Sequence, residues 1–328
     1  MGDEKMNEYI LKLKNLAEIR IYSDIDSVNH KLEAHKSVTK TIPVDIVSKG
    51  VVKEIDTNEN YITVLKGYEK KVLIDVDNNT AHLFTNKEDT EEFFFPDLVY
   101  LAISMFANIM QRKGYYFIQG SVVKYDDIHS VMFIGDPNSG KTSMAFNFIE
   151  EYGCSLISND NVLVGIENNE LKTIAGTKPM QMRYGAIKTS FPTILPTVEI
   201  DKTDQNRNPW DVKVYVDEYL KNINCQYADD SIVTDIYNIK AYKTGETFIK
   251  GKEQIDERLW IYEQLTKQIR SNRYVLVGYD YPIPSFESNE YMQERYNIAK
   301  QVTEITNIYD ATGTVKELTK RIGKNIWK

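Results

Sequence analysis

The sequence has few of the residues that disulfide frameworks and metal sites need. Its two cysteines, Cys154 and Cys225, lie far apart and form no C-x-x-C pattern, which argues for a reduced, intracellular protein. Cys154, between a glycine and a serine, is expected to be a small buried residue rather than a nucleophile. Among the four histidines, His30 and His35 are five positions apart, whereas the i, i+4 spacing would put two ligands on one helix face. We therefore expect a cytoplasmic location and no histidine metal site.

A long apolar run and a positive net charge are also missing. The most apolar stretch, residues 93–110, is interrupted by Pro96, Asp97, Ser104 and Asn108, whereas a membrane span needs about 20 apolar residues. The N-terminal stretch lacks the apolar centre of a secretory signal peptide. The formal net charge of −8 argues against broad nucleic-acid binding, which needs a basic face. We expect neither a membrane nor a nucleic acid as partner.

The chain is long enough for one large or two modest domains. Its 328 residues are 42% hydrophobic and 27% charged, as in a globular protein with an ample core. The pattern changes near residue 90, which predicts an accessory α+β domain at 1–90 and a larger nucleotide-binding core at 91–328. In the first part, residues 7–35 have helical spacing. Alternating apolar and polar residues then predict a small antiparallel sheet from strands at 42–48, 51–56, 61–66, 71–77 and 80–85.

The second part begins with a predicted core helix after Pro96. Its buried face is expected to carry Leu98, Leu101, Ala102, Met105, Phe106 and Ile109. Predicted strands follow at 115–118, 121–125, 131–134, 274–277 and 305–309, and predicted helices at 142–152, 252–271, 288–301 and 314–322. The polar stretch 201–210 is the segment we expect to be a mobile loop.

The most informative motif is a complete G-x-x-x-x-G-K-[ST] phosphate loop. It consists of Gly135, Asp136, Pro137, Asn138, Ser139, Gly140, Lys141 and Thr142, with Ser143 directly after it. A short apolar run precedes it and a segment with helical spacing follows it, so the loop is predicted to join a strand to a helix. A glycine-containing turn that matches by chance is the alternative, and the strand–helix context disfavours it.

The motif predicts a phosphate-binding site with defined roles. Backbone N–H groups of the loop and the start of the helix would face a phosphate, because the helix dipole favours negative charge there. Lys141 would reach the β- and γ-phosphates, and the Thr142 hydroxyl would bind Mg²⁺.

A second signal is the carboxylate of Asp160 in the run Leu156 to Val164. It lies at the end of a predicted strand, roughly twenty residues after Lys141, where nucleotide enzymes place an Mg²⁺-binding or base carboxylate. Asn-Asp-Asn is also a common turn sequence, and alone it would favour a turn. The position relative to the phosphate loop favours the functional interpretation.

Several motifs together resemble one family. They are Gln119-Gly120-Ser121-Val122-Val123, then Gly135 to Thr142, then Gly153-Cys154-Ser155-Leu156-Ile157-Ser158-Asn159-Asp160, then Met180 to Ile187, and finally Tyr309 to Leu318. In this order they resemble the kinase core of the HPr kinase/phosphorylase family and its relatives, including kinases that phosphorylate lasso-peptide precursors. The resemblance covers about residues 115–190 and 305–322 and is most specific around the phosphate loop.

The resemblance implies an α/β fold with a P-loop kinase core of the HPr-kinase/PEP-carboxykinase type. It implies ATP or GTP as the nucleotide, and Mg²⁺ held by Thr142 and Asp160. Asp160 would also orient or deprotonate the acceptor hydroxyl, Gln119 would stand where the family has a histidine, and Arg183 would clamp a phosphate. Many relatives are oligomers, so a homo-oligomer is left open.

Three positions depart from the family pattern. Gln119 replaces a histidine, Asn159 replaces the first Asp of an Asp-Asp pair, and Gln181 replaces a glutamate. Each swap keeps hydrogen bonding but removes a charge or a titratable group. These departures put a phosphorylase reaction, and HPr as substrate, in doubt.

The first hypothesis is therefore an ATP-dependent kinase acting on a hydroxyl of a peptide, a protein or a small molecule. The second is a nucleotide-binding regulatory or scaffold protein with little kinase activity, which Gln119, Asn159 and Gln181 motivate. A PEP-carboxykinase-like enzyme is a third, to which the four histidines give little support.

Overall fold

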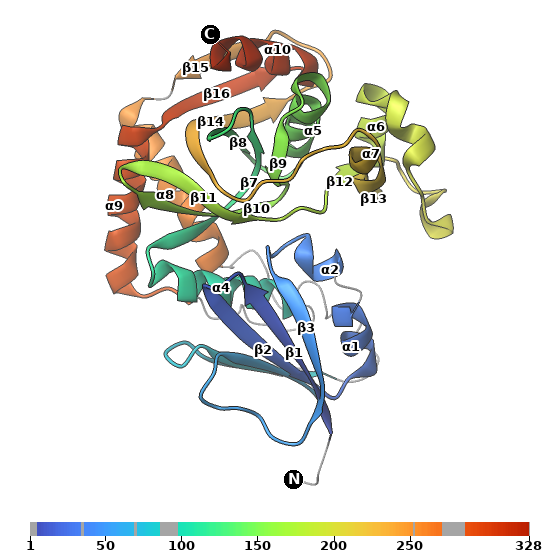
Figure 1. The fold of residues 1–328 in the computed structure, drawn as a ribbon, viewed down its shortest axis with the longest axis vertical. Helices are drawn as coiled ribbons and strands as arrows, with labels where there is room; N and C mark the ends of the chain where they lie inside the picture. The colour runs from blue at the N-terminus through green and yellow to red at the C-terminus, as the bar shows by residue number, and fades with distance from the viewer. Residues whose placement is uncertain are drawn as a thin grey trace. The chain divides into compact units, whose positions relative to one another are not determined.

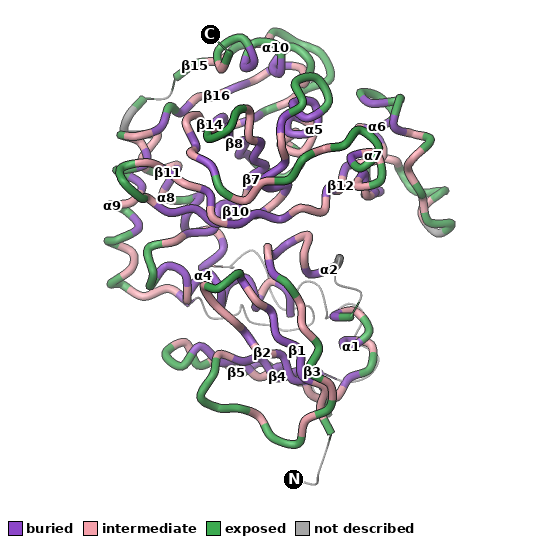
Figure 2. Tube along the Cα trace, in the orientation of Figure 1, coloured by how far each residue is buried: buried purple, intermediate pink, exposed green. Residues whose placement is uncertain are grey.

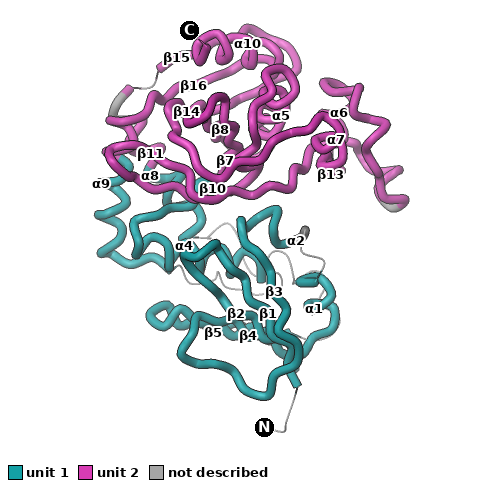
Figure 3. The backbone as a smooth tube through the Cα atoms, in the orientation of Figure 1, with its two compact units in different colours: residues 1–118, 262–299 teal, residues 119–261, 300–328 magenta. Residues whose placement is uncertain are grey.

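The computed structural model describes residues 5–33, 36–68, 71–85, 98–251, 253–270 and 286–327, and it is a mixed α/β structure (Figure 1). Its contacts divide the chain into two compact units (Figure 3). Unit 1 comprises Met1–Ile118 and Tyr262–Ala299, and unit 2 comprises Gln119–Ile261 and Lys300–Lys328. This division does not coincide with the boundary expected near residue 90, because residues 98–118 and 262–299 group with the N-terminal strands.

Unit 1 is built on a six-stranded mixed sheet with the strand order β3-β1-β2-β4-β6-β5. Its strands are β1 (Met6–Leu13), β2 (Ala17–Ser23), β3 (Asp45–Val52), β4 (Tyr61–Lys66), β5 (Lys71–Asp75) and β6 (Thr80–Thr85). The predicted antiparallel arrangement is wrong for two pairings, since β2 pairs with β4 and β4 with β6 in parallel. The alternating pattern reports one buried face per strand and carries no information on strand direction.

The helix predicted from the spacing of residues 7–35 is also wrong for most of its length. Residues 6–23 form β1 and β2, which pair as an antiparallel hairpin, and among the described residues of this range only α1 (Asp26–Glu33) is helical. The short α2 (Lys36–Thr39) follows the range. In β1, the consecutive residues Tyr9, Ile10 and Leu11 are all buried. A strand that is covered on both faces gives a continuous apolar run instead of alternation, and such a run does not distinguish strand from helix.

Three longer helices contribute to unit 1. They are α4 (Tyr100–Gln111) and parts of α8 (Gln254–Arg270) and α9 (Asn289–Ile305). α4 is buried almost all round, and of its predicted core residues only Ile109 is half-buried. The strand predicted at 274–277 lies outside the described residues. Within the described ranges, no helix is both long and apolar enough to cross a bilayer.

Unit 2 holds an eight-stranded sheet with the order β11-β10-β7-β8-β14-β16-β15, in which β9 also pairs with β7. The strands are β7 (Tyr115–Lys124), β8 (His129–Ile134), β9 (Ser155–Ser158), β10 (Asn161–Glu167), β11 (Glu170–Gly176), β14 (Ser231–Ala241), β15 (Phe248–Gly251) and β16 (Asn307–Gly313). The two strands predicted at 115–118 and 121–125 are one strand, β7. The central strands β8, β14 and β16 are parallel, so their carboxyl ends meet at one edge.

Helices α5 (Lys141–Tyr152) and α10 (Val315–Ile326) pack together against this sheet (Figure 1). The Asn147 amide of α5 donates a buried 3.0 Å hydrogen bond to the Thr319 hydroxyl of α10. The remaining elements are β12 (Gln181–Arg183), α6 (Tyr184–Ser190), the 3₁₀ helices η3 (Pro192–Thr197) and η4 (Lys202–Asp204), β13 (Lys213–Tyr215) and α7 (Asp217–Asn222). The stretch 201–210 contains η4 and a hydrogen-bonded turn at 204–207, and its mobility stays a prediction.

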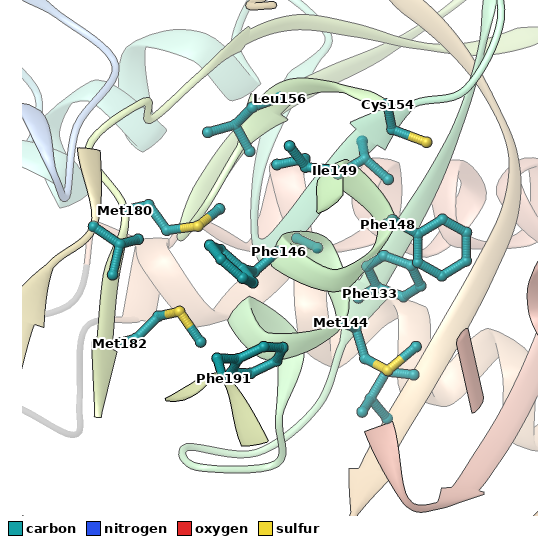
Figure 4. Close-up of a cluster of buried hydrophobic side chains, with 14 of the residues drawn as sticks. Phe133, Met144, Phe146, Phe148, Ile149, Cys154, Leu156, Met180, Met182 and Phe191 are labelled. Atoms are coloured by element: carbon teal, nitrogen blue, oxygen red, sulfur yellow. The ribbon is translucent and has the colours of Figure 1, made fainter. Parts of the chain in front are cut away.

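The core of unit 2 is centred on α5 (Figure 4), whose middle residues are buried (Figure 2). On one side the Phe148 ring lies 5.2 Å from that of Phe133 in β8. On another side the Phe146 ring meets Phe191 edge-on, with 4.9 Å between the ring centroids. α5 is therefore packed both against the sheet and against the segment that carries β12, and this fixes the position of its N-terminus.

Replacing Phe146 by alanine should destabilise unit 2 by about 3–5 kcal/mol, because a fully buried ring is removed and the cavity closes only in part. Urea unfolding followed by circular dichroism would measure the change. Leu259→Ala is the control, since that side chain is 57% exposed and its loss should change stability by about 0.5 kcal/mol or less. Equal effects of the two substitutions would contradict the packing described for α5.

Candidate functional site

The phosphate-loop motif forms the connection between β8 and α5, as the sequence predicts. β8 ends at Ile134 and α5 begins at Lys141. Between them, Gly135 (φ 152°), Asn138 (φ 67°) and Gly140 (φ 101°) have positive φ angles, which fold the loop back on itself. Gly140 is the N-cap of α5 and offers no side chain to the first N–H groups of the helix. The arrangement leaves a helix N-terminus beside the carboxyl ends of the parallel strands β8, β14 and β16.

Both motif glycines are required by the close approach of β14. A Cβ atom on Gly135 would lie 2.6 Å from the carbonyl oxygen of Ile239, and one on Gly140 would lie 2.6 Å from the Cβ of Ala241. The backbone N–H of Ala241 donates to the Ser139 carbonyl at 2.8 Å. The end of β14 therefore packs directly against the loop, and only glycine fits at positions 135 and 140.

The Lys141 ammonium group lies within the loop. It donates to the carbonyl oxygens of Gly135 at 3.0 Å and Asp136 at 2.9 Å. Thr142 and Ser143 follow in the first turn of α5 and are half-buried. A positive charge and a hydroxyl group thus stand next to the helix N-terminus, where the helix dipole also favours an anion.

Asp160 occupies the corner between β9 and β10, and the structure brings it together with Gln119. The Gln119 amide donates to one carboxylate oxygen at 3.3 Å, and the Asn161 amide donates to the other at 3.2 Å. The backbone N–H of Asp160 donates to the Thr177 hydroxyl at 2.9 Å. The carboxylate is therefore oriented by two amides from different strands.

The sheet register places this corner near the phosphate loop. The N–H of Gly120 donates to the carbonyl oxygen of Asp160 at 2.7 Å, and Gly120 is also the partner of Ile134 in the β7–β8 pair. Adjacent strands are about 4.8 Å apart, so the backbone of Asp160 lies roughly 10 Å from the end of β8. One β-strand therefore separates the carboxylate from the loop.

Asn159 has a structural role at the same corner. It is buried, its amide donates to the carbonyl oxygen of Pro179 at 3.2 Å, and its own carbonyl accepts from the Ser121 hydroxyl at 2.6 Å. A carboxylate in its place could not donate to Pro179. The corner is thus built for a single carboxylate, that of Asp160.

Arg183 lies at the tip of the phosphate loop. Its Nε and Nη2 atoms donate to the Asn138 side-chain oxygen at 3.3 and 3.1 Å. The β12–β13 pair carries it there, while Gln181, two residues earlier, is half-buried opposite Tyr215. The guanidinium therefore lies beside the phosphate loop, and its role as a phosphate clamp stays a prediction.

Sequence reasoning missed Thr177 and Asn161, which support Asp160. The Thr177 hydroxyl accepts from the backbone N–H groups of both Asp160 and Asn161. Thr177 reaches them only because the β10–β11 pair brings residue 176 opposite residue 162. The sequence motif contains no sign of this pairing.

His129 and Cys154 lie at the ends of β8 and α5 that are opposite to the phosphate loop. His129 begins β8, at the opposite end from the phosphate loop, and pairs with Asp126 at 2.8 Å. Within the part of the chain that the structure describes, no three His, Cys, Asp or Glu side chains gather as a metal cluster. Cys154 is buried, and burial raises the pKa of its thiol to about 12. The expectation of a buried, unreactive Cys154 agrees with this environment.

Comparison with known proteins gives little similarity. No known protein family matches the sequence, and no curated protein matches it. A similar solved structure is the HPr(Ser) kinase/phosphatase from Coxiella burnetii, at 11% sequence identity and a TM-score of 0.29. The alignment covers 64% of this chain and 93% of that chain. A similarity this low does not support a function for this chain.

Gly140→Ala should disrupt the phosphate loop, because the new Cβ meets Ala241 and because φ is 101° there. We expect a loss of about 1–3 kcal/mol of stability and of any phosphate binding by the loop. Gly153→Ala, at the other end of α5, is the matched control. Gly153 also has a positive φ of 67°, but its added Cβ has no neighbour within 4 Å. Thermal unfolding of both variants would test this, and a greater loss in Gly153→Ala would contradict it.

Cys154 should react with iodoacetamide at pH 8 far more slowly than Cys225. Burial raises the pKa of both thiols, but Cys154 is the more buried and carries almost no thiolate at that pH. Peptide mass spectrometry over a time course would separate the two sites. Faster labelling of Cys154 in the folded protein would be inconsistent with its position in the core.

Proposed function

We propose that this chain is an ATP-dependent, Mg²⁺-assisted kinase with a P-loop core of the HPr-kinase/PEP-carboxykinase type. It transfers a phosphoryl group to a hydroxyl of a peptide, a protein or a small molecule. The observation that carries the proposal is the loop between β8 and α5, with Lys141 inside it and the oriented carboxylate of Asp160 one strand away. Phosphoryl transfer needs mostly positioning and charge stabilisation, and this arrangement provides both.

The phosphates of the nucleotide bind at the loop. The N–H groups at the start of α5 have no capping side chain, and a phosphate would accept from them. Lys141, already placed among the loop residues, neutralises charge on the group being transferred. Arg183 adds a guanidinium fork at the loop tip, which suits phosphate oxygens.

Thr142 and Asp160 fit the requirements of Mg²⁺. The ion takes oxygen ligands, and in kinases it is held by one or two carboxylates together with phosphate oxygens and water. Both carboxylate oxygens of Asp160 accept hydrogen bonds from neutral amides, so its orientation is fixed before any ligand binds. When bound, the ion would offset the negative charge that develops on the transferred phosphoryl group.

Gln119 positions Asp160, the carboxylate that would face the acceptor hydroxyl. Its amide holds one oxygen of the carboxylate that would orient or deprotonate the acceptor hydroxyl. A glutamine cannot take up a proton as the family's histidine can, so Asp160 would be the base. This arrangement favours the forward kinase reaction over the phosphorylase reaction.

A nucleotide-binding regulatory protein is the second candidate. Gln119 donates to the Asp160 carboxylate, and Asn159 donates to the backbone at the same corner, both through neutral amides. Asp160 is therefore the one ionisable group at positions where the family has a histidine and two aspartates. In that case the chain would bind ATP and hold it without turnover. The two candidates differ in turnover and agree on binding.

Lys141→Ala should weaken ATP binding at least tenfold, and Asp160→Asn should lower phosphoryl transfer by about 10²–10³-fold while ATP still binds. Calorimetry with Mg²⁺ and ATP would measure binding, and release of ADP over hours would measure turnover, first to water and then to candidate peptides. Asp126→Asn is the control, because Asp126 precedes β8, at the end of that strand opposite the loop.

Three outcomes separate the alternatives. Binding with turnover that Asp160→Asn abolishes supports the kinase. Binding without turnover against any acceptor supports the regulatory protein. Absence of ATP and GTP binding in the unmodified chain would refute both.

A further inference from the structure

Trp210 is a large, partly exposed side chain that none of the roles above uses. Its backbone is held beside α6, because the N–H of Gly185 donates to the carbonyl of Pro209 at 2.7 Å. Its ring lies directly against Gly185, where a Cβ atom would come within 2.6 Å of the indole. The ring is still 39% exposed. Trp210 is thus fixed on the segment that follows Arg183, with part of its surface open.

Lys243, which follows β14 in the chain, contacts this ring. Its ammonium nitrogen lies 4.5 Å from the centre of the Trp210 ring, within cation–π distance. Lys243 stands two residues after Ala241, whose N–H holds the Ser139 carbonyl of the loop. The Trp210–Lys243 contact therefore joins two segments that both contact the loop. The segment of Trp210 contacts Asn138 through Arg183. The segment of Lys243 contacts Ser139 through Ala241.

The groups that hold these two cations are uncharged. Arg183 donates to an amide oxygen, and Lys243 sits over an aromatic ring. A carboxylate partner would cancel each charge, whereas an amide or a ring positions the cation and leaves its charge to act on a nearby anion. In a chain with 48 acidic and 40 basic residues, these two cations add positive charge on the segments that flank the loop.

We propose that Lys243 is a third cation of the phosphate site, and that it binds the polyphosphate of a nucleoside triphosphate together with Lys141 and Arg183. Trp210 is its positioning residue and holds the ammonium group near the loop before the ligand arrives. This inference rests on the proposed nucleotide binding and adds to it a preference for triphosphate over monophosphate. Because binding draws the ammonium group towards phosphate, it also changes the surroundings of the Trp210 ring.

Lys243→Gln should weaken binding of Mg²⁺-ATP about tenfold, since a hydrogen bond to a charged group contributes roughly 1.5 kcal/mol, and should leave AMP binding nearly unchanged. Lys243→Arg keeps both the charge and the cation–π contact, so it should bind ATP almost as the unmodified chain does. Trp210→Leu should resemble Lys243→Gln, and Trp210→Phe should retain most of the affinity. Calorimetry on the full chain would give all these values.

The matched control is Lys172→Gln. It removes one positive charge from the same sheet, but Lys172 pairs with Ile232, which pairs with His129 at the start of β8, the end away from the loop. Its effect on ATP binding should be less than twofold. A loss equal to that in Lys243→Gln would mean that net charge alone explains the result, and would overturn the proposal.

Tryptophan fluorescence provides a second measurement that does not depend on activity. The chain has three tryptophans, Trp210, Trp260 and Trp327. ATP should change the emission of the unmodified chain and of Trp260→Phe, and should have little effect on emission in Trp210→Phe or Lys243→Gln. If the unmodified chain binds no ATP, the proposed function fails. If it binds ATP and Lys243→Gln binds it equally well, only the role of Lys243 fails.

Discussion

The close approach of β14 to the loop between β8 and α5 is the constraint on which the rest of the site depends. Ile239 and Ala241 leave no space for a side chain on Gly135 or Gly140, and the Ala241 N–H holds the loop backbone. Because β14 and β8 are paired strands of one sheet, the loop conformation is fixed by the same hydrogen-bond ladder that builds the fold. A loop held in this way would lose little conformational freedom on binding a ligand, which would favour affinity.

Packing around α5 extends this constraint to the neighbouring groups. Phe148 fixes the helix to the sheet, and Phe146 fixes it to the segment of β12, which carries Arg183 to the loop tip. On the other side, β7 links the loop to the Asp160 corner through Gly120. The candidate catalytic groups therefore come from separate segments, and each is positioned by strand pairing or by a buried aromatic contact rather than by a flexible connection.

How much the sequence could predict depends on how local each feature is. The phosphate loop, its strand and its helix are contiguous, so residues 131–152 were enough to predict this strand–loop–helix unit, although not its contacts with β14. Asp160 follows the next strand, β9, as predicted. The parallel pairings of β4 were missed because hydrophobic patterns report burial and not strand direction. The hairpin of β1 with β2 was missed because a strand buried on both faces has no alternation that distinguishes it from a helix. Thr177, Trp210 and Lys243 were missed for a related reason: each reaches the site through contacts between residues more than fifteen positions apart, which a single sequence does not encode in any motif.

The position of β16 has a consequence for the order in which the chain is made. β16 lies between β14 and β15 in the sheet, yet its residues are synthesised after those of both neighbours and after the whole 262–299 segment. Until residues 307–313 emerge from the ribosome, β14 has an open edge beside the phosphate loop, and an open edge of this kind readily pairs with other chains. Completion of the sheet of unit 2 must therefore wait until residues 307–313 have been made, and products that stop before them would be poorly protected from aggregation.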